Sequence, residues 1–151
     1  MRIKTVSAII AIIFLSNIYA MAQMTLAKAT KGKFLFGVAV NMQQVNGINP
    51  AESELIAKEF NSIVAENCMK PQPIHPQEDK YQWTDADKFV AFGEKNKQVV
   101  IGHCLIWHSQ IGRWFFVDEN GKDVTPEVLK ERMRQHITTV VGRYKGRVKG
   151  W

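Results

Sequence analysis

Short apolar runs alternate with helix-forming segments along most of this sequence, and that order constrains the fold more than any other feature. The runs at 34–40 (FLFGVAV), 61–67 (NSIVAEN) and 99–107 (VVIGHCLIW) predict buried strands, and 147–151 (RVKGW) begins a fourth. Strands that alternate with helices are typical of parallel βαβ units, whose crossovers are right-handed. The sequence therefore predicts an α/β fold with a parallel sheet.

Residues that commonly open helices precede each helical segment. Asn49 with Pro50, Thr84, and Thr125 with Pro126 stand at these positions, and Glu52 would complete a capping box with Asn49. The segment after Thr125 is the longest. Its apolar residues recur with the 3.6-residue period of a helix: Leu129, Met133, Ile137, Val140, Val141 and Tyr144.

Two architectures fit this alternation, an open doubly wound sheet and a TIM barrel. No glycine-rich phosphate loop follows the first strand, because Gly37 lies inside it and the turn at 41–47 reads NMQQVNG. This argues against a nucleotide-binding fold. The prolines within 71–76 predict an irregular loop after the second strand. The 151 residues are about half of a typical ~250-residue barrel.

The N-terminus has the pattern of a secretory signal peptide over residues 1–22. Two basic residues precede the apolar run at 6–18, and Ala20-Met21-Ala22 fits a cleavage site. We expect cleavage near Ala22, a spacer over 23–33, and a secreted or periplasmic protein with no membrane span after cleavage. An uncleaved anchor is the alternative, but the run is shorter than the ~18 residues that span a bilayer.

The net charge bears on which partners are expected, and the two cysteines on whether a disulfide is expected. The formal net charge of +6 would allow nucleic-acid binding, but export argues against it, and solvated helix faces account for the basic residues. Cys68 and Cys104 could pair in an oxidising compartment. We expect two buried free thiols, because a chain this rich in apolar residues does not need a disulfide.

Polar side chains follow the second predicted strand. Glu66, Asn67 and Lys70 offer a carboxylate, an amide and an ammonium. Such a set suits sugar hydroxyls, which both donate and accept hydrogen bonds. A salt bridge in a loop beside a turn-forming asparagine is the alternative.

The segment GHCLIWHSQ, residues 102–110, ends the third predicted strand. On a continuous strand His103 and His108, five residues apart, would point to opposite faces, which argues against a zinc site. His103 and Trp107 would share a face with Leu105, either as core packing or as the floor of a cleft. An aromatic face beside hydrogen-bonding groups suits a pyranose ring. No metal or cofactor is expected.

Four segments in the same order resemble the glycoside hydrolase family 10 endo-β-1,4-xylanases. They are FNSIVAENCMKP, YQWTDADKFVAFGEKN, GHCLIWHSQ and HITTVVGRYKGRVKGW, and the resemblance covers nearly all of residues 34–151. It implies a partial (β/α)8 TIM barrel, made of about the first three βα units and the start of strand four. It also implies cleavage of internal bonds in xylan with retention of configuration.

The resemblance also implies roles for seven residues. In the family, one set of residues binds the sugar two places to the non-reducing side of the cleaved bond, and it is matched here by Glu66, Asn67, Lys70 and Gln110. A second set lines the site of the sugar whose bond is cut, and it is matched by His103, Trp107 and His108. The chain departs mildly from the family pattern at Pro71, Ile101 and Cys104.

Neither catalytic glutamate of the family has a match here. The acid/base glutamate ends the fourth-strand motif Trp-Asp-Val-Val-Asn-Glu, whose first residue matches Trp151, and the nucleophile lies on strand seven. We therefore expect both glutamates beyond Trp151 and no hydrolysis by these residues alone. The partner implied is xylan or xylo-oligosaccharide. The rival from another class is a non-catalytic xylan-binding protein on a degenerate barrel.

Overall fold

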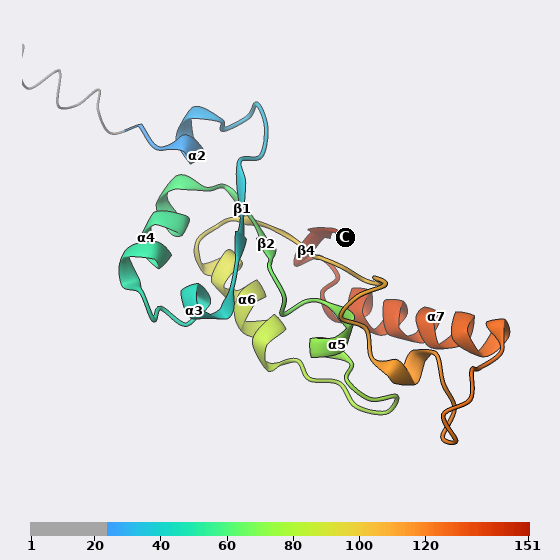
Figure 1. The fold of residues 1–151 in the computed structure, drawn as a ribbon. Coiled ribbons are helices and arrows are strands. Elements are labelled where there is room, and N and C mark those ends of the chain that lie inside the picture. The colour runs from blue at the N-terminus through green and yellow to red at the C-terminus, as the bar shows by residue number, and fades with distance from the viewer. Residues whose placement is uncertain (1–23) are drawn as a thin grey trace, which may run out of the picture.

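A four-stranded parallel sheet forms the centre of the computed structural model, which describes residues 24–151 (Figure 1). Its strands are β1 (Gly37–Val40), β2 (Ser62–Ala65), β3 (Val99–Ile101) and β4 (Val148–Gly150). Each strand pairs in parallel with the next along the chain. This unreversed order is that of a barrel, whereas a doubly wound sheet reverses direction at a switch point. The prediction of a partial barrel is confirmed.

Helices connect the strands and lie beside the sheet (Figure 1). The three longest, which confirm the three predicted helical segments, are α4 (Pro50–Glu59), α6 (Thr84–Lys95) and α7 (Pro126–Arg143). The shorter elements are α2 (Leu26–Ala29), α3 (Met42–Val45), α5 (Pro71–Ile74) and the 3-10 helix η1 (Arg113–Phe115). Thr125 caps α7 as predicted, since its hydroxyl accepts from the Val128 N–H.

The core lies where α6 packs on β2 and β3. Phe89, Val90 and Gly93 form the buried face of α6, as their spacing predicts, and they meet Ile63 and Val100 of the sheet. Gly93 allows this approach, because a Cβ there would lie 2.9 Å from Ile63 Cδ1 and would also collide with Val100 Cγ2. The helix can therefore sit close to the sheet only with glycine at this position.

This close contact predicts opposite effects for alanine at two helical glycines. Gly93→Ala should lower the free energy of unfolding, because overpacking costs roughly 1–3 kcal/mol and exceeds the gain in helix propensity. Gly142→Ala, in α7, should raise it by about 0.5–1 kcal/mol, since nothing lies within 4 Å of its Cβ position. Urea denaturation of both variants measures the difference, and equal effects would contradict the packing described.

Each of the four predicted strands is longer than the observed one, and the ends of β1 and β3 have visible reasons. β1 begins only at Gly37, with the side chains of Phe34 and Leu35 61% and 55% exposed, because the Phe36 N–H donates to the Asn61 side chain rather than to a strand. β3 ends at Ile101; the Gly102 N–H still donates to Gly150 O of the paired strand β4, and beyond it the chain leaves the sheet. The alternation of faces predicted for His103 to Trp107 therefore does not apply.

The proline-rich segment was expected to be irregular, but it contains α5. Pro71 and Pro73 lie in the first turn, where the missing N–H groups would have no helical acceptor. The cap of α6 is also one residue earlier than predicted, at Trp83 rather than Thr84. Asn49 is the N-cap residue of α4, but its side chain accepts no backbone hydrogen bond; its amide donates to the Glu52 carboxylate, so the predicted capping box does not form.

The predicted spacer at 23–33 includes a turn of helix. Thr25 caps α2 through a hydrogen bond from the Lys28 N–H, and the Leu26 N–H donates to the Glu59 carboxylate on α4. The predicted signal peptide lies outside the described residues. Among residues 24–151, the structure contains no helix with the length and apolar character needed to cross a bilayer.

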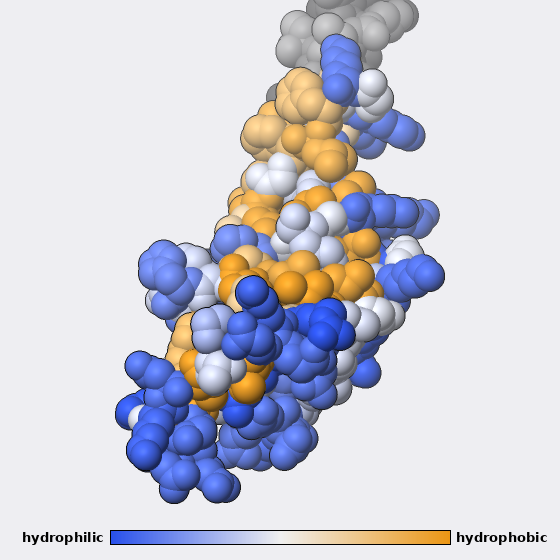
Figure 2. Space-filling model, turned by 90° about the vertical axis from the view of Figure 1, so that its right-hand side faces the viewer, coloured by the Kyte–Doolittle hydropathy of each residue, from blue (hydrophilic) through white to orange (hydrophobic). Residues whose placement is uncertain are grey.

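Apolar and polar side chains separate on the face shown in Figure 2. Hydrophobic residues gather over its upper part, at the height of α2 and the start of β1, and hydrophilic residues cover its lower part. The exposed large apolar residues of segment 24–35 are Met24, Leu26, Phe34 and Leu35. On α7, Val141 is 37% exposed, although its spacing places it with the apolar stripe.

Candidate functional site

Two segments that leave the sheet at its C-terminal edge supply the predicted site residues. Glu66 and Asn67 follow β2 directly, and the Glu66 N–H donates to Val40 O, which keeps this segment beside β1. Lys70 then stands at the N-cap of α5. The second segment, 102–112, follows β3. Active sites in parallel α/β folds lie at this edge of the sheet.

The structure brings four of the seven predicted residues into one cluster. The Lys70 ammonium donates to Asn67 Oδ1 (2.9 Å) and lies 4.7 Å from the centre of the Trp107 ring. His108 packs edge-on against Trp107, with ring centres 5.3 Å apart. A cation within about 6 Å of an aromatic face is attracted to it. Lys70, Asn67, Trp107 and His108 are hereafter called the Lys70 cluster.

The Lys70 side chain holds its charge in an unusual setting. The residue is only 7% exposed, yet no ion pair among residues 24–151 includes it. An ammonium has three N–H donors, and Asn67 Oδ1 accepts one of them. Buried charges normally have partners. The remaining donors are therefore suited to a ligand that presents oxygen atoms.

The other three predicted residues lie at the rim. Gln110 has a positive φ of 50°, and its carbonyl accepts from the Gln72 N–H (2.8 Å), which ties segment 102–112 to α5. Glu66 and His103 are exposed, and among residues 24–151 their side chains make no hydrogen bond. They share the edge of the sheet with the Lys70 cluster, and among residues 24–151 no side-chain hydrogen bond joins them to it.

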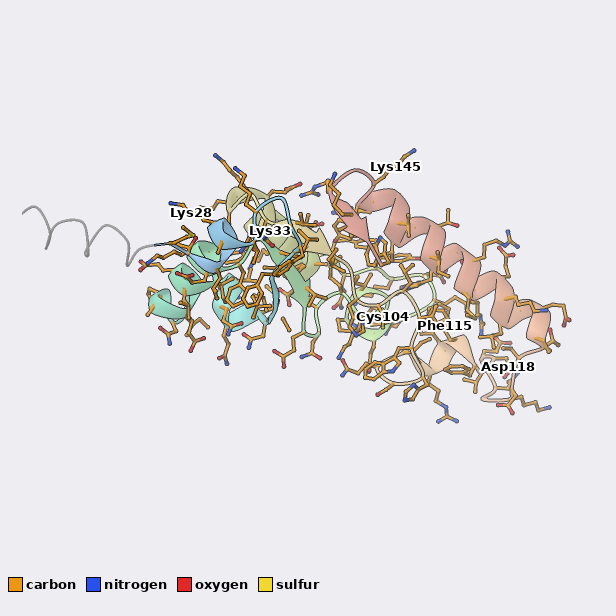
Figure 3. All side chains as sticks on the ribbon, turned by 90° about the horizontal axis from the view of Figure 1, so that it is seen from above. Lys28, Lys33, Cys104, Phe115, Asp118 and Lys145 are labelled. Carbon is orange, nitrogen blue, oxygen red and sulfur yellow. The ribbon has the colours of Figure 1, made fainter. Side chains whose placement is uncertain are left out.

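Both cysteines are free thiols, as predicted, although only Cys68 is fully buried. Burial raises the pKa of Cys68 to about 12. Burial also raises the pKa of Cys104, and the nearby Lys70 charge opposes that rise. Cys104 belongs to segment 102–112. It lies on the same side of the molecule as Phe115, near α7 and away from Lys28 and Lys33 (Figure 3).

Within residues 24–151 no group of three or more histidine, cysteine or acidic residues could hold a metal ion.

A buried cluster that the sequence did not predict lies at the C-terminal end of α5. His75 and His136 are 0% and 1% exposed and are packed with Tyr81, Trp114 and Phe115. His136 had a usable signal, because it lies on the same helical stripe as Met133 and Val140. His75 had none, since it follows a proline-rich segment without a periodic pattern.

Comparison with known proteins gives the same family as the sequence motifs. The sequence profile of glycosyl hydrolase family 10 matches residues 25–151. An endo-1,4-beta-xylanase A of Xylanibacter ruminicola is 55% identical over 118 residues, which are 78% of this chain and 32% of that protein. An endo-1,4-beta-xylanase A of Thermotoga maritima is 43% identical over 130 residues, 83% of this chain and 12% of that protein. The chain thus spans a third or less of these relatives.

Solved structures agree with the fold described above. A family 10 endoxylanase from a sugarcane soil metagenome superimposes with a TM-score of 0.79 at 42% identity, over 83% of this chain and 37% of that one. A mutant of an intracellular xylanase from Thermoanaerobacterium saccharolyticum, in complex with xylotriose, gives a TM-score of 0.77 at 35% identity, over 86% and 43%. From the profile match over nearly all of the described residues, we conclude that the chain belongs to glycosyl hydrolase family 10.

Proposed function

We propose that this chain provides the non-reducing-side sugar-binding part of an endo-1,4-β-xylanase. The Lys70 cluster is the observation that carries the proposal, because it combines a nearly buried ammonium, an amide and an aromatic ring at the catalytic edge of the sheet. Sugar rings need this combination, since their faces are apolar and their edges carry hydroxyls. The chain belongs to glycosyl hydrolase family 10, and the two relatives described above are endo-1,4-beta-xylanases.

The proposal assigns the seven predicted residues to two neighbouring sugar sites. Lys70 donates hydrogen bonds to hydroxyls of the sugar two places from the cleaved bond, and Asn67 orients its ammonium. Glu66 and Gln110 contact the same sugar from the rim. Trp107, with His103 and His108, lines the neighbouring place, where the sugar whose bond is cut would lie.

Bond cleavage requires two carboxylates that the seven residues do not include. A retaining double displacement needs one carboxylate as nucleophile and one carboxyl as acid/base, about 5–5.5 Å apart. Glu66 is the single acidic residue among the seven, and it has no acidic partner in that set. We propose that both catalytic glutamates come from sequence beyond Trp151.

Hydrolysis by the full-length protein tests this function. We expect it to release reducing sugar from xylan and to form the β-anomer first, as followed by proton NMR. A protein restricted to residues 24–151 should release none. Binding of xylan without hydrolysis by the full-length protein would instead support the non-catalytic xylan-binding role, and neither binding nor hydrolysis would refute the proposal.

We also propose that the protein is exported, on the pattern of residues 1–22. Export would place the enzyme in contact with a polymer that does not enter cells. N-terminal sequencing of protein collected from the periplasm or medium of the producing cell should read from Gln23. Recovery only from the cytoplasm, with Met1 retained, would contradict this.

A further inference from the structure

A pair of buried histidines lies at the opposite end of α5 from Lys70. The Nδ1 atoms of His75 and His136 are 3.1 Å apart, and the two rings are nearly parallel, at 8°. His75 Nε2 lies 2.8 Å from Glu78 O. The pair joins three parts of the chain: the end of α5, the middle of α7 and the loop after α5.

The contacts define which nitrogen carries each proton. A carbonyl oxygen can only accept, so His75 Nε2 must donate to Glu78 O. Burial lowers the pKa of both rings, that of His136 to about 4, so both are neutral near pH 7. Neutral His75 therefore has a lone pair on Nδ1 that can accept from His136 Nδ1–H, and His136 also interacts with the backbone of Leu105, which opposes the lowering of its pKa.

His75 of the pair and Lys70 lie at opposite ends of α5. Lys70 is the N-cap of this four-residue helix and His75 is its C-cap, where the His75 N–H donates to Pro71 O (2.7 Å). A single turn of helix has little stability of its own. Its position must be set by contacts with the rest of the protein, and Gln110 O provides one at its first turn.

Aromatic side chains enclose the pair and add contacts to the same end of α5. Tyr81 stacks on the His75 ring with centres 3.8 Å apart, and Trp114 Nε1 donates to His75 O (3.1 Å). The charged groups nearby are Glu78, Asp79 and Arg132, and the Arg132 guanidinium pairs with the Glu78 carboxylate. These contacts leave the His75 ring in one orientation.

We propose that His75 and His136 are positioning residues for the sugar site. Through the Nδ1–Nδ1 hydrogen bond, α7 fixes the C-terminal end of α5, and α5 holds the Lys70 ammonium over Trp107 and against Asn67. The inference rests on the proposed sugar-binding role of Lys70. Neither histidine touches the sugar itself.

Two substitutions of His136 separate positioning from stability. Asparagine places an amide N–H near the position of Nδ1 and can still donate to His75, whereas leucine fills similar space without a donor. In the full-length protein, His136→Leu should raise KM for short xylo-oligosaccharides about tenfold with kcat little changed, since small misplacements of a binding group are costly. His136→Asn should restore KM to within about twofold of the original.

A solely structural role would give a different result. It would lower the thermal stability of His136→Leu and the amount of active enzyme, but it would leave KM unchanged, and that outcome would overturn the proposal. Equal KM increases in both variants would overturn it as well, because the retained donor would then have no effect.

Nitrogen-15 NMR of the unmodified protein tests the pair without any sugar or variant. We expect His136 to be the Nδ1–H tautomer and His75 the Nε2–H tautomer at pH 7. An Nε2–H tautomer at His136 would exclude the hydrogen bond and the inference with it. If the tautomers are as expected but no xylo-oligosaccharide binds, the proposed function fails while the description of the pair stands.

Discussion

Lys70→Met in the full-length protein should weaken binding of short xylo-oligosaccharides by roughly 10- to 150-fold. The change keeps most of the alkyl chain and removes a charged donor, and hydrogen bonds to charged groups contribute about 1.5–3 kcal/mol. Lys70 is nearly buried beside Asn67 and Trp107, so water cannot easily replace the lost contact. Isothermal titration with xylotriose measures the loss.

The substrate's length and a matched lysine supply the controls for this experiment. Long xylan should lose less affinity than xylotriose, because polymer contacts additional sites along the cleft. Lys130→Met, which removes an exposed lysine on α7, should leave both affinities unchanged. An unchanged affinity for xylotriose in Lys70→Met would show that Lys70 is not a sugar ligand.

Acidification should destabilise the protein well above the pH at which its carboxylates titrate. The folded pKa of His136 is about 4, below its ordinary 6.5, because burial disfavours the charged ring and His75 adds repulsion. Between pH 4 and 6.5 the unfolded chain therefore binds more protons at His136 than the folded protein does. Stability should be full above pH 6.5 and decrease as the pH falls towards 4, by roughly 3 kcal/mol at 1.36 kcal/mol per pKa unit. The pKa of His75 is lowered in the same direction.

Urea denaturation across pH 4 to 7 measures this dependence. The ion-paired carboxylates act at lower pH: Arg143 and Arg147 lower the pKa values of Asp87 and Glu94, whose contributions are lost below their ordinary 3.8 and 4.5, so that only Glu94 overlaps the lowest part of this range. His136→Asn removes one titrating ring and should reduce the slope between pH 6.5 and 4. A flat profile in the unmodified protein over that range would contradict the burial of neutral histidines.

The order of elements could be predicted because apolar periodicity is a local property. The run at 61–67 and the helix after Thr125 appear where their patterns place them. The ends of β1 and β3 could not be predicted in this way. β1 starts where the Phe36 N–H donates to the side chain of Asn61, which is distant in sequence, and β3 ends after its last hydrogen bond to β4, from the Gly102 N–H to Gly150 O.

The candidate site could be predicted only in part, because residue types are visible in the sequence and contacts between distant segments are not. The types and order of its residues are visible in the sequence, and the family resemblance assigns them roles. The contact between Lys70 and Trp107 depends instead on how segment 102–112 folds over α5. The buried histidines were missed because His75 and His136 become partners only when α7 packs behind α5.

A crystal structure of the full-length protein with xylotriose would show whether the Lys70 cluster binds sugar. We expect a sugar ring at the C-terminal edge of the sheet, with Lys70 Nζ and Asn67 within hydrogen-bonding distance of its hydroxyls and Trp107 beside the neighbouring ring. Xylotriose bound elsewhere on the protein, with Lys70 making no contact to it, would contradict the proposed sugar site.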